Sequence, residues 1–355
     1  MKNNIKKSGK KILFGVAGEG LGHSARAKIV IQHLKKQGHK VKIITYHQGY
    51  WDLKNEFNDV KKIFGLRFSH KNGKTTYPGT VLENIKKTPE ATKSFQDVKK
   101  IIKKFNPDII FTDLEPLSSL VAHLYKIPLV SIDNQHRITQ GEVEYNKKWI
   151  LDYYLNKMGV STVAFNANAY IITSFFDFKI THPNTYIVPP ILQNKIFRAH
   201  PTRGEHILVY NTTTDVKTFL DLLKNRPETF IIYGPNKNKQ EKNCIFKKQS
   251  KNQFLKDLIS AKAVIASAGF TLISEAIQLK KPYLALPIKK RIEQLINAHY
   301  LKKLNYGDYS ENLSPEEIDS FLQNISHYEK ALKKYKPRKD NSELYKLLNN
   351  LIKEL

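Results

Sequence analysis

The chain has 355 residues, which is more than one ordinary hydrophobic core and enough for two domains. Its hydrophobic content of 41% and charged content of 26% are typical of a globular protein. A single cysteine, Cys244, excludes an intrachain disulfide and a cysteine-based zinc cluster. No stretch has the roughly 18 to 20 apolar residues of a membrane span, and the apolar run after the basic start is too short for a signal peptide. We therefore expect a cytoplasmic protein.

The chain is strongly basic, with 59 Lys and Arg against 32 Asp and Glu and a net charge of +27. Such a charge attracts polyanions, including nucleic acid, anionic lipid headgroups and nucleotide phosphates. The lysines are spread along the whole sequence in pairs and do not gather in one arginine-rich arm. A functional basic face and a general compositional bias explain this pattern equally well.

The first half alternates short β-rich runs with helical periods. Apolar runs without polar alternation, separated by helices, indicate a parallel sheet covered on both faces. The predicted strands are 11–16, 39–46, 107–113 and 127–133, and the predicted helices are 24–37, 88–105 and 116–126. Two further runs, 169–176 and 184–192, close this half.

A second alternating series follows the stiff Pro189-Pro190 pair. Its predicted strands are 206–211, 229–234, 263–269 and 282–288, with helices at 215–224, 252–261 and 271–280. We expect an α/β fold of two doubly wound Rossmann-like domains that face each other across a cleft, with domains at 1–188 and 189–335. An amphipathic helix within 336–355 is expected to pack back on the first domain. In such folds ligands bind at the carboxyl ends of the strands.

The stretch "GEGLGHSAR", residues 18–26, joins the first strand to the first helix. It is not a dinucleotide fingerprint, because Gly22 comes one residue too early and the second strand ends without an acid. It is not a Walker loop either, because no Gly-Lys-Ser/Thr follows. A glycine turn that projects His23 at a helix amino end remains. The helix dipole there favours the neutral, basic imidazole. The alternative is a histidine that merely caps or packs at a turn.

The second half has a comparable turn within residues 266–301. Gly269 precedes a helix, so free backbone N–H groups there form an anion site. Glu275 on that helix has a carboxylate that can accept both hydroxyls of a ribose. Glu293 and Gln294 follow the next strand and can hydrogen-bond sugar hydroxyls. The alternative is that these residues are ordinary polar helix surface.

At these residues the chain resembles the GT-B glycosyltransferases that use nucleotide sugars. It is similar to the N-acetylglucosaminyltransferase of peptidoglycan synthesis and to diacylglycerol glycosyltransferases, and especially to an uncharacterised archaeal and bacterial branch of that superfamily. The resemblance implies transfer of a sugar, most commonly from a UDP-linked donor, to an acceptor hydroxyl with inversion. It also implies that 1–188 binds the acceptor and 189–335 binds the nucleotide sugar, which is a substrate and not a cofactor.

The resemblance assigns a role to each matching residue. Gly269, Phe270 and Thr271 would hold the diphosphate, Glu275 the ribose, and Glu293, Gln294 and Asn297 the donor sugar, while Thr212 and Thr213 replace a second glycine-rich turn. His23 falls at the general-base position, between Gly20 and Gly22 on one side and the helix on the other. Asp113, 90 positions later, is expected to orient His23 as in a hydrolase triad. Glu115 and His136, near strand ends, are expected on the acceptor side.

The acceptor is expected to be a lipid or a glycan, at the inner face of a membrane. Segments 61–79 and 147–157 mix lysine with aromatic residues, as interfacial segments do, although a hairpin and a core helix explain them as well. No D-x-D pair is present, so no metal is expected. Two rival functions stay open: a protein that binds or modifies nucleic acid through its basic surface, and a nucleotide-sugar epimerase or hydrolase of the same fold.

Overall fold

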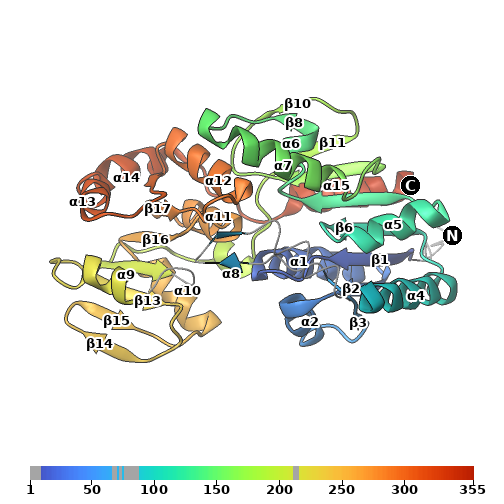
Figure 1. Ribbon diagram of the computed structural model, residues 1–355, viewed down its shortest axis with the longest axis horizontal. Coiled ribbons are helices and arrows are strands. Elements are labelled where there is room, and N and C mark those ends of the chain that lie inside the picture. The colour runs from blue at the N-terminus through green and yellow to red at the C-terminus, as the bar shows by residue number, and fades with distance from the viewer. Residues whose placement is uncertain (1–8, 66–69, 72–73, 76–87, 211–215) are drawn as a thin grey trace, which may run out of the picture.

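The structure is a computed structural model that describes residues 9–65, 70–71, 74–75, 88–210 and 216–355. Two seven-stranded sheets form its two lobes, and helices lie on both faces of each sheet (Figure 1). The two sheets are built from successive halves of the chain, as the two series of apolar runs predict. The expected fold class, two doubly wound α/β domains, is confirmed.

The first sheet has the order β11-β9-β7-β6-β1-β2-β3, and all its neighbouring strands are parallel. Its strands are β1 (Lys11–Val16), β2 (Lys40–Thr45), β3 (Val60–Lys62), β6 (Ile109–Asp113), β7 (Leu129–Asp133), β9 (Ala169–Thr173) and β11 (Thr185–Val188). The winding reverses between β1 and β6, where Val16 pairs in register with Asp113. Whatever follows these two strands therefore meets at the switch point, which is where doubly wound sheets bind ligands.

The helices of this half are α1 (Leu21–Lys36), α2 (His47–Lys54), α4 (Thr88–Phe105), α5 (Pro116–Tyr125), α6 (Arg137–Gln140) and α7 (Ile150–Ser161), with the 3₁₀ turn η1 (Lys147–Trp149) before α7. Two short antiparallel pairs join β8 (Gly141–Glu142) to β10 (Lys179–Ile180) and β4 (His70–Lys71) to β5 (Lys74–Thr75). Helix α1 begins three residues before the predicted start, because Gly20 turns the chain at φ 80°, a backbone conformation that favours glycine.

The second sheet has the order β14-β15-β13-β12-β16-β17-β18, with only the edge strand β14 antiparallel. Its strands are β12 (His206–Tyr210), β13 (Thr229–Tyr233), β14 (Lys239–Glu241), β15 (Cys244–Phe246), β16 (Ala263–Ser267), β17 (Tyr283–Leu286) and β18 (Gly307–Tyr309). Its helices are α8 (Asn194–Phe197), α9 (Val216–Leu223), α10 (Lys251–Ser260), α11 (Phe270–Gln278), α12 (Ile292–Lys303), α13 (Pro315–Gln323) and α14 (Ile325–Lys334). The switch point of this sheet lies between β12 and β16.

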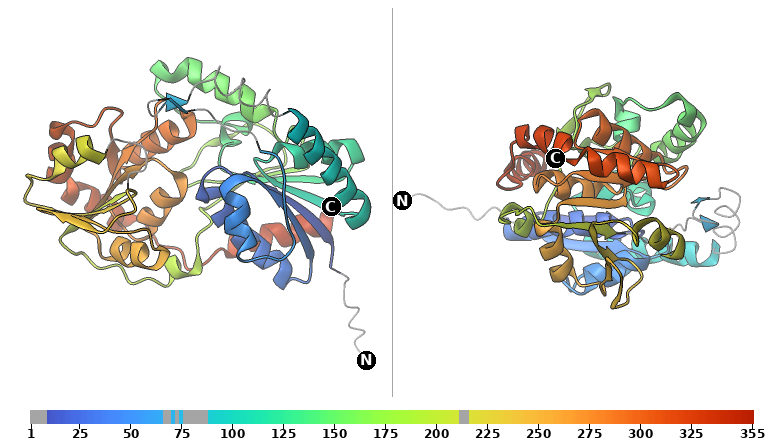
Figure 2. Two further views of the ribbon diagram at one scale, coloured as in Figure 1. Left: turned by 60° about the horizontal axis from the view of Figure 1, so that its bottom comes forward. Right: turned by 90° about the vertical axis from the view of Figure 1, so that its left-hand side faces the viewer.

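The last helix, α15 (Ser342–Glu354), returns to the first lobe, beside α1 (Figure 2, left). Its Leu344 and Leu348 belong to the same buried cluster as Ile12 and Phe14 of β1. The chain therefore crosses between the lobes twice. The two crossing segments are hydrogen-bonded to each other, because Leu192 N donates to Asn341 Oδ1 and Asn341 Nδ2 donates back to Leu192 O.

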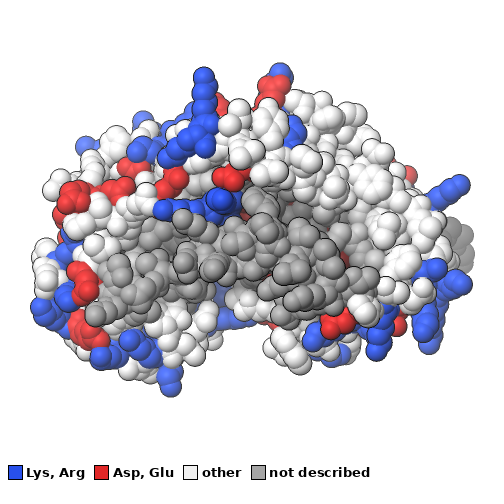
Figure 3. All heavy atoms as spheres, in the orientation of Figure 1, with Lys and Arg blue, Asp and Glu red and all other residues white. Residues whose placement is uncertain are grey.

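The surface charge is distributed over both lobes. On the face seen in Figure 3, Lys and Arg side chains lie around the rim of each lobe with acidic side chains among them. Among the described residues, none of the helices combines the length and the apolar character needed to cross a bilayer.

Candidate active site

His23 and Asp113 meet at the switch point of the first sheet. His23 lies in the first turn of α1, after β1, and its Nδ1 lies 2.8 Å from Oδ1 of Asp113, the last residue of β6. The Asp113 side chain is fully buried, whereas 17% of the His23 side chain is exposed. When Nδ1–H donates to the carboxylate, the lone pair is left on Nε2, so this ring can accept a proton from a bound hydroxyl.

Arg26 completes this cluster, one turn further along α1. Its Nε and Nη2 donate to the two carboxylate oxygens of Asp113 at 2.9 and 2.7 Å, in the bidentate geometry that arginine favours. Burial alone would lower the pKa of Arg26, but Asp113, with smaller contributions from Asp133 and Glu293, outweighs burial and raises that pKa. The sequence interpretation missed Arg26, although its spacing of three residues from His23 on a helix was a usable signal.

Two helix amino ends meet where the lobes face each other. A Cβ built on Gly22, in the first turn of α1, would lie 3.2 Å from Oγ1 of Thr271, in the first turn of α11. The N-cap residues are Gly20 for α1 and Gly269 for α11, and no described side chain caps either helix. Backbone N–H groups of both first turns are therefore left for a ligand, and both helix dipoles favour an anion there.

Glu275 lies on α11, and its carboxylate has no hydrogen-bond partner among the residues that the structure describes. Burial raises the pKa of Glu275 to about 7, and Lys195 acts in the opposite direction. A partly buried carboxylate without a partner is costly to a folded protein, so hydroxyl donors from a ligand would satisfy it. Phe270, at the start of the same helix, is buried against Phe175, with the ring centroids 5.8 Å apart.

The three predicted sugar-binding residues lie on the first turns of α12, next to the α11 turn. Asn297 Nδ2 donates to the backbone oxygen of Ala268, directly before Gly269, at 3.0 Å. Gln294 is buried, and its Oε1 accepts a hydrogen bond from Ile288 N at 2.9 Å. Glu293 faces the first domain, where its carboxylate accepts hydrogen bonds from two side chains described below.

Glu115 and His136 do not lie free on the acceptor side. Glu115 is the N-cap of α5, where its carboxylate accepts from Leu117 N and Ser118 N, and burial raises its pKa to about 7. His136 is buried with both ring nitrogens engaged: Nδ1 lies 2.6 Å from Asp133 Oδ2 and Nε2 lies 2.9 Å from the Val163 oxygen. Both side chains are buried in the internal hydrogen bonds of the first domain, and their role on the acceptor side stays a prediction. Thr212 and Thr213 lie outside the described residues.

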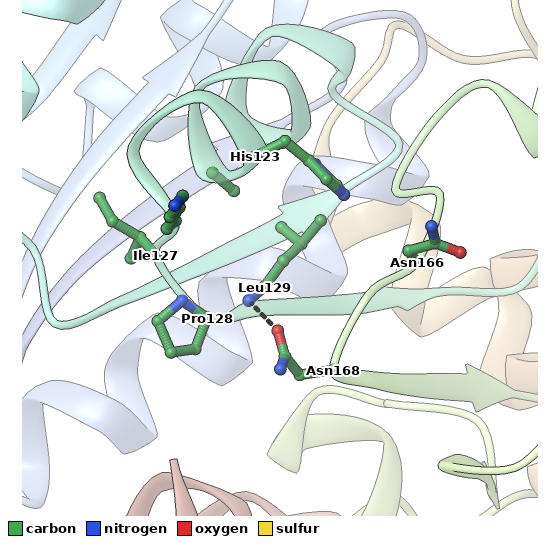
Figure 4. Close-up of a pocket in the computed structure, with 8 residues that line it drawn as sticks. His123, Ile127, Pro128, Leu129, Asn166 and Asn168 are labelled. Carbon is green, nitrogen blue, oxygen red and sulfur yellow. Dashed lines mark hydrogen bonds between the residues drawn. The ribbon is translucent and has the colours of Figure 1, made fainter.

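A separate pocket of about 310 Å³ lies at the amino ends of β7 and β9, on the side of the first sheet opposite the switch point (Figure 4). It is lined by the end of α5 and the starts of β7 and β9: Ala122, His123, Lys126, Ile127, Pro128, Leu129, Asn166 and Asn168. Because Leu129 begins β7 and Asp133 ends it, this pocket is one strand length away from the switch point. It is not part of the candidate active site. Within the described ranges, no three His, Cys, Asp or Glu side chains are grouped to hold a metal ion.

Comparison with known proteins identifies the class. Glycosyl transferase family 1 matches residues 10–326, and the chain belongs to this family. An uncharacterised glycosyltransferase of Methanosarcina acetivorans is 22% identical over 334 residues, covering 87% of each chain. The UDP-N-acetylglucosamine–N-acetylmuramyl-(pentapeptide) pyrophosphoryl-undecaprenol N-acetylglucosamine transferase of Clostridium botulinum is 24% identical, covering 92% of this chain and 99% of its own.

Solved structures show the same fold. The crystal structure of MurG from Acinetobacter baumannii superimposes with a TM-score of 0.64 at 16% identity, covering 96% of this chain and 99% of that one. The glycotransferase of kitacinnamycin gives a TM-score of 0.65 at 11% identity, with the same coverage. The protein is thus a glycosyltransferase with the GT-B fold, related to MurG and to uncharacterised archaeal glycosyltransferases, and the predicted family resemblance is confirmed.

Proposed function

We propose that this glycosyltransferase moves a hexose from a nucleoside diphosphate sugar, with UDP as the favoured nucleotide, to an acceptor hydroxyl with inversion at the anomeric carbon. One observation carries this proposal: His23, paired with Asp113, lies in the helix turn that comes closest to the uncapped amino end of α11, at Gly22 and Thr271. This proximity supports a base in the first domain that faces an anion site in the second. Relatives whose names specify a UDP-linked donor support the choice of nucleotide.

On the donor side, the diphosphate binds the first-turn N–H groups of α11, after Gly269. The ribose hydroxyls donate to the Glu275 carboxylate, which has no described protein partner. Glu293, Gln294 and Asn297 contact the sugar from α12. Helix dipoles stabilise the charge of the diphosphate in this arrangement, so the described residues offer an alternative to a metal ion.

The chemical step is a displacement at the anomeric carbon. Nε2 of His23 takes the proton of the acceptor hydroxyl while its oxygen forms the new bond to that carbon. The bond to the diphosphate oxygen breaks on the opposite face, and the electron pair leaves with the diphosphate. The α11 amino end stabilises the negative charge of the leaving group. Asp113 holds the imidazole in the tautomer that leaves Nε2 free, and stabilises the imidazolium that forms.

For the acceptor side we propose docking on an anionic membrane surface through α7. Five of its side chains form an exposed apolar stripe: Ile150, Leu151, Tyr154, Leu155 and Met158 are each 40% to 70% exposed. Their spacing places them on one face of the helix, turned away from the buried Tyr153 and Val160. Lys147 and Lys148 flank the start of this stripe. An outward apolar face with lysines at its edge is typical of helices that lie in a membrane interface.

Titration with nucleotides tests the donor proposal. Calorimetry with UDP, other nucleoside diphosphates and their sugars should give saturable binding, with UDP forms the tightest, and binding should raise the melting temperature. No binding of any nucleoside diphosphate would refute it. If free sugar is released as fast without an acceptor as with a lipid extract, the protein is a hydrolase of this fold.

Co-sedimentation with vesicles tests the acceptor side. The protein should pellet with phosphatidylglycerol vesicles, and Leu151→Glu together with Met158→Glu should release it. Trp51→Glu is the matched control, because Trp51 is 63% exposed but lies on α2. If both variants still pellet as the wild type does, α7 is not the docking face.

A further inference from the structure

Arg137 is buried where the two domains meet, on the first residue of α6. Its side chain is fully buried, and burial lowers its pKa to about 10, so the guanidinium remains charged at neutral pH. Its Nη2 donates to the Asn297 Oδ1 at 2.8 Å and to the backbone oxygen of Glu293 at 3.1 Å. Its Nε and Nη1 have no hydrogen-bond partner among the described residues. A buried charge with two unpaired donors destabilises a fold, so stability alone does not account for an arginine at this position.

Asn134 and Gln135, which precede Arg137 in the chain, also contact α12. Asn134 Nδ2 donates to Glu293 Oε1 at 2.9 Å, and Gln135 Nε2 lies 3.5 Å from Glu293 Oε2. Segment 134–137 of the first domain therefore contacts both Glu293 and Asn297, which lie one helical turn apart at the start of α12. Both are residues that the proposed function places against the donor sugar.

The contact is closely packed on both sides. Phe176 of the first domain lies over the guanidinium, with 5.2 Å from the Arg137 Cζ to its ring centroid, and stacks on Tyr300 of α12 at 3.6 Å. Ile292, Leu295 and Ile296 belong to one buried cluster with first-domain residues. Helix α12 is thus packed against the first domain as well as its own, so its first turns have little freedom to adjust.

We propose that Arg137 is the positioning residue for donor-sugar recognition. It belongs to the acceptor domain, yet it fixes the side chain of Asn297 and the backbone at Glu293, while Asn134 orients the Glu293 carboxylate. Recognition of the donor sugar therefore depends on contact between the domains. Binding of the nucleotide through α11 does not depend on that contact. This inference rests on the proposed function, because it takes Glu293 and Asn297 as the residues that contact the sugar.

The test compares the affinity for UDP with that for UDP-sugars by calorimetry. In the wild type, one sugar of a UDP-sugar panel should bind more tightly than UDP. Arg137→Met should weaken that UDP-sugar by about tenfold or more while UDP binds as before, because hydrogen bonds from a charged group are lost. Arg137→Lys should restore part of the difference. Asn134→Ala, which leaves Arg137 in place, should also weaken the sugar selectively and serves if Arg137→Met does not fold.

Tyr300→Phe is the control. It removes another hydrogen bond between the first domain and α12, from Glu144 N to the Tyr300 hydroxyl at 2.9 Å, without touching Glu293 or Asn297. It should leave the preference for the sugar unchanged. The inference would be overturned if Arg137→Met lost UDP and UDP-sugar affinity equally, or lost neither. It would also be overturned if the wild type bound every UDP-sugar no better than UDP. A wild type that binds no nucleotide at all would instead overturn the proposed function.

Discussion

Gly22 of the first domain faces Thr271 of the second so closely that a Cβ on Gly22 would be 3.2 Å from the Thr271 Oγ1. The glycine thereby lets the turn that carries His23 approach the anion site of α11. Any side chain at position 22 would press on Thr271, in the first turn of α11.

Gly22→Val should therefore weaken nucleotide-sugar binding and reduce turnover, because the branched side chain pushes Thr271 away or fills the donor site. Turnover can be measured as release of the nucleoside diphosphate. The matched control is Gly159→Ala on α7, where a Cβ would meet nothing within 4 Å. Since alanine is the better helix former, this control should keep activity and gain up to about 1 kcal/mol of stability. Unchanged donor binding in Gly22→Val would show that the cleft holds no ligand at this point.

His23→Ala should reduce turnover by about 10² to 10⁴-fold, the usual contribution of a general base, while the affinity for UDP changes little. His33→Ala on the same helix is the control. His33 stacks on Tyr345 of α15, with ring centroids 4.1 Å apart, so its loss should affect stability and not turnover. Wild-type turnover in His23→Ala would end the assignment of the base.

Arg26→Met should destabilise the protein by about 3 to 5 kcal/mol, because it leaves the fully buried Asp113 carboxylate without its charged partner. Chemical denaturation measures the free energy of unfolding. Arg203→Met removes an ion pair with Glu329 in which the arginine is half exposed, and should cost about 0 to 1 kcal/mol. Similar losses in the two variants would mean that the Arg26–Asp113 pair is no more than a surface ion pair in energetic terms.

The raised pKa of Glu275 predicts that the affinity for UDP depends on pH. Its pKa is raised from 4.5 to about 7, so it is mostly protonated at pH 6 and ionised at pH 8. Ribose hydroxyls donate to the ionised form, and affinity for UDP should therefore rise over this range. Glu275→Gln should remove that rise, and the difference between the two proteins isolates the carboxyl group, because the ionisation of the phosphate affects both equally.

The same shift has the opposite sign for stability. Between pH 4.5 and 7 the folded protein retains a proton that the unfolded chain has lost, so the free energy of unfolding falls as pH rises through this window. Glu115, also raised to about 7, contributes in the same direction. Between pH 5 and pH 8, Glu275→Gln should therefore lose less unfolding free energy than the wild type. Equal changes in the two proteins across this window would contradict the raised pKa of Glu275.

The long strands of both sheets were predictable because they are continuous apolar runs, whereas the short strands β3, β14, β15 and β18 were not predicted. The predicted strand 107–113 contains β6 (Ile109–Asp113), and helix 88–105 coincides with α4. The start of α1 was missed because Gly20 supplies the turn without a side-chain cap, so the usual signal of a helix start is absent.

The site was only partly predictable. Motifs locate His23 and Gly269, because a glycine turn before a helix is a local pattern. Arg26 and Arg137 contact residues 87 and 160 positions away, and such pairs depend on how the sheets and domains assemble. Glu115 was placed on the acceptor side for its position after a strand, which is equally the position of a helix cap.

A crystal structure with a bound UDP-sugar tests the central claim most directly. We predict diphosphate oxygens that accept hydrogen bonds from the first-turn N–H groups of α11, a ribose on Glu275, and an anomeric carbon on the side of the cleft that holds His23. A diphosphate bound away from α11, or an anomeric carbon turned away from the imidazole, would contradict the account.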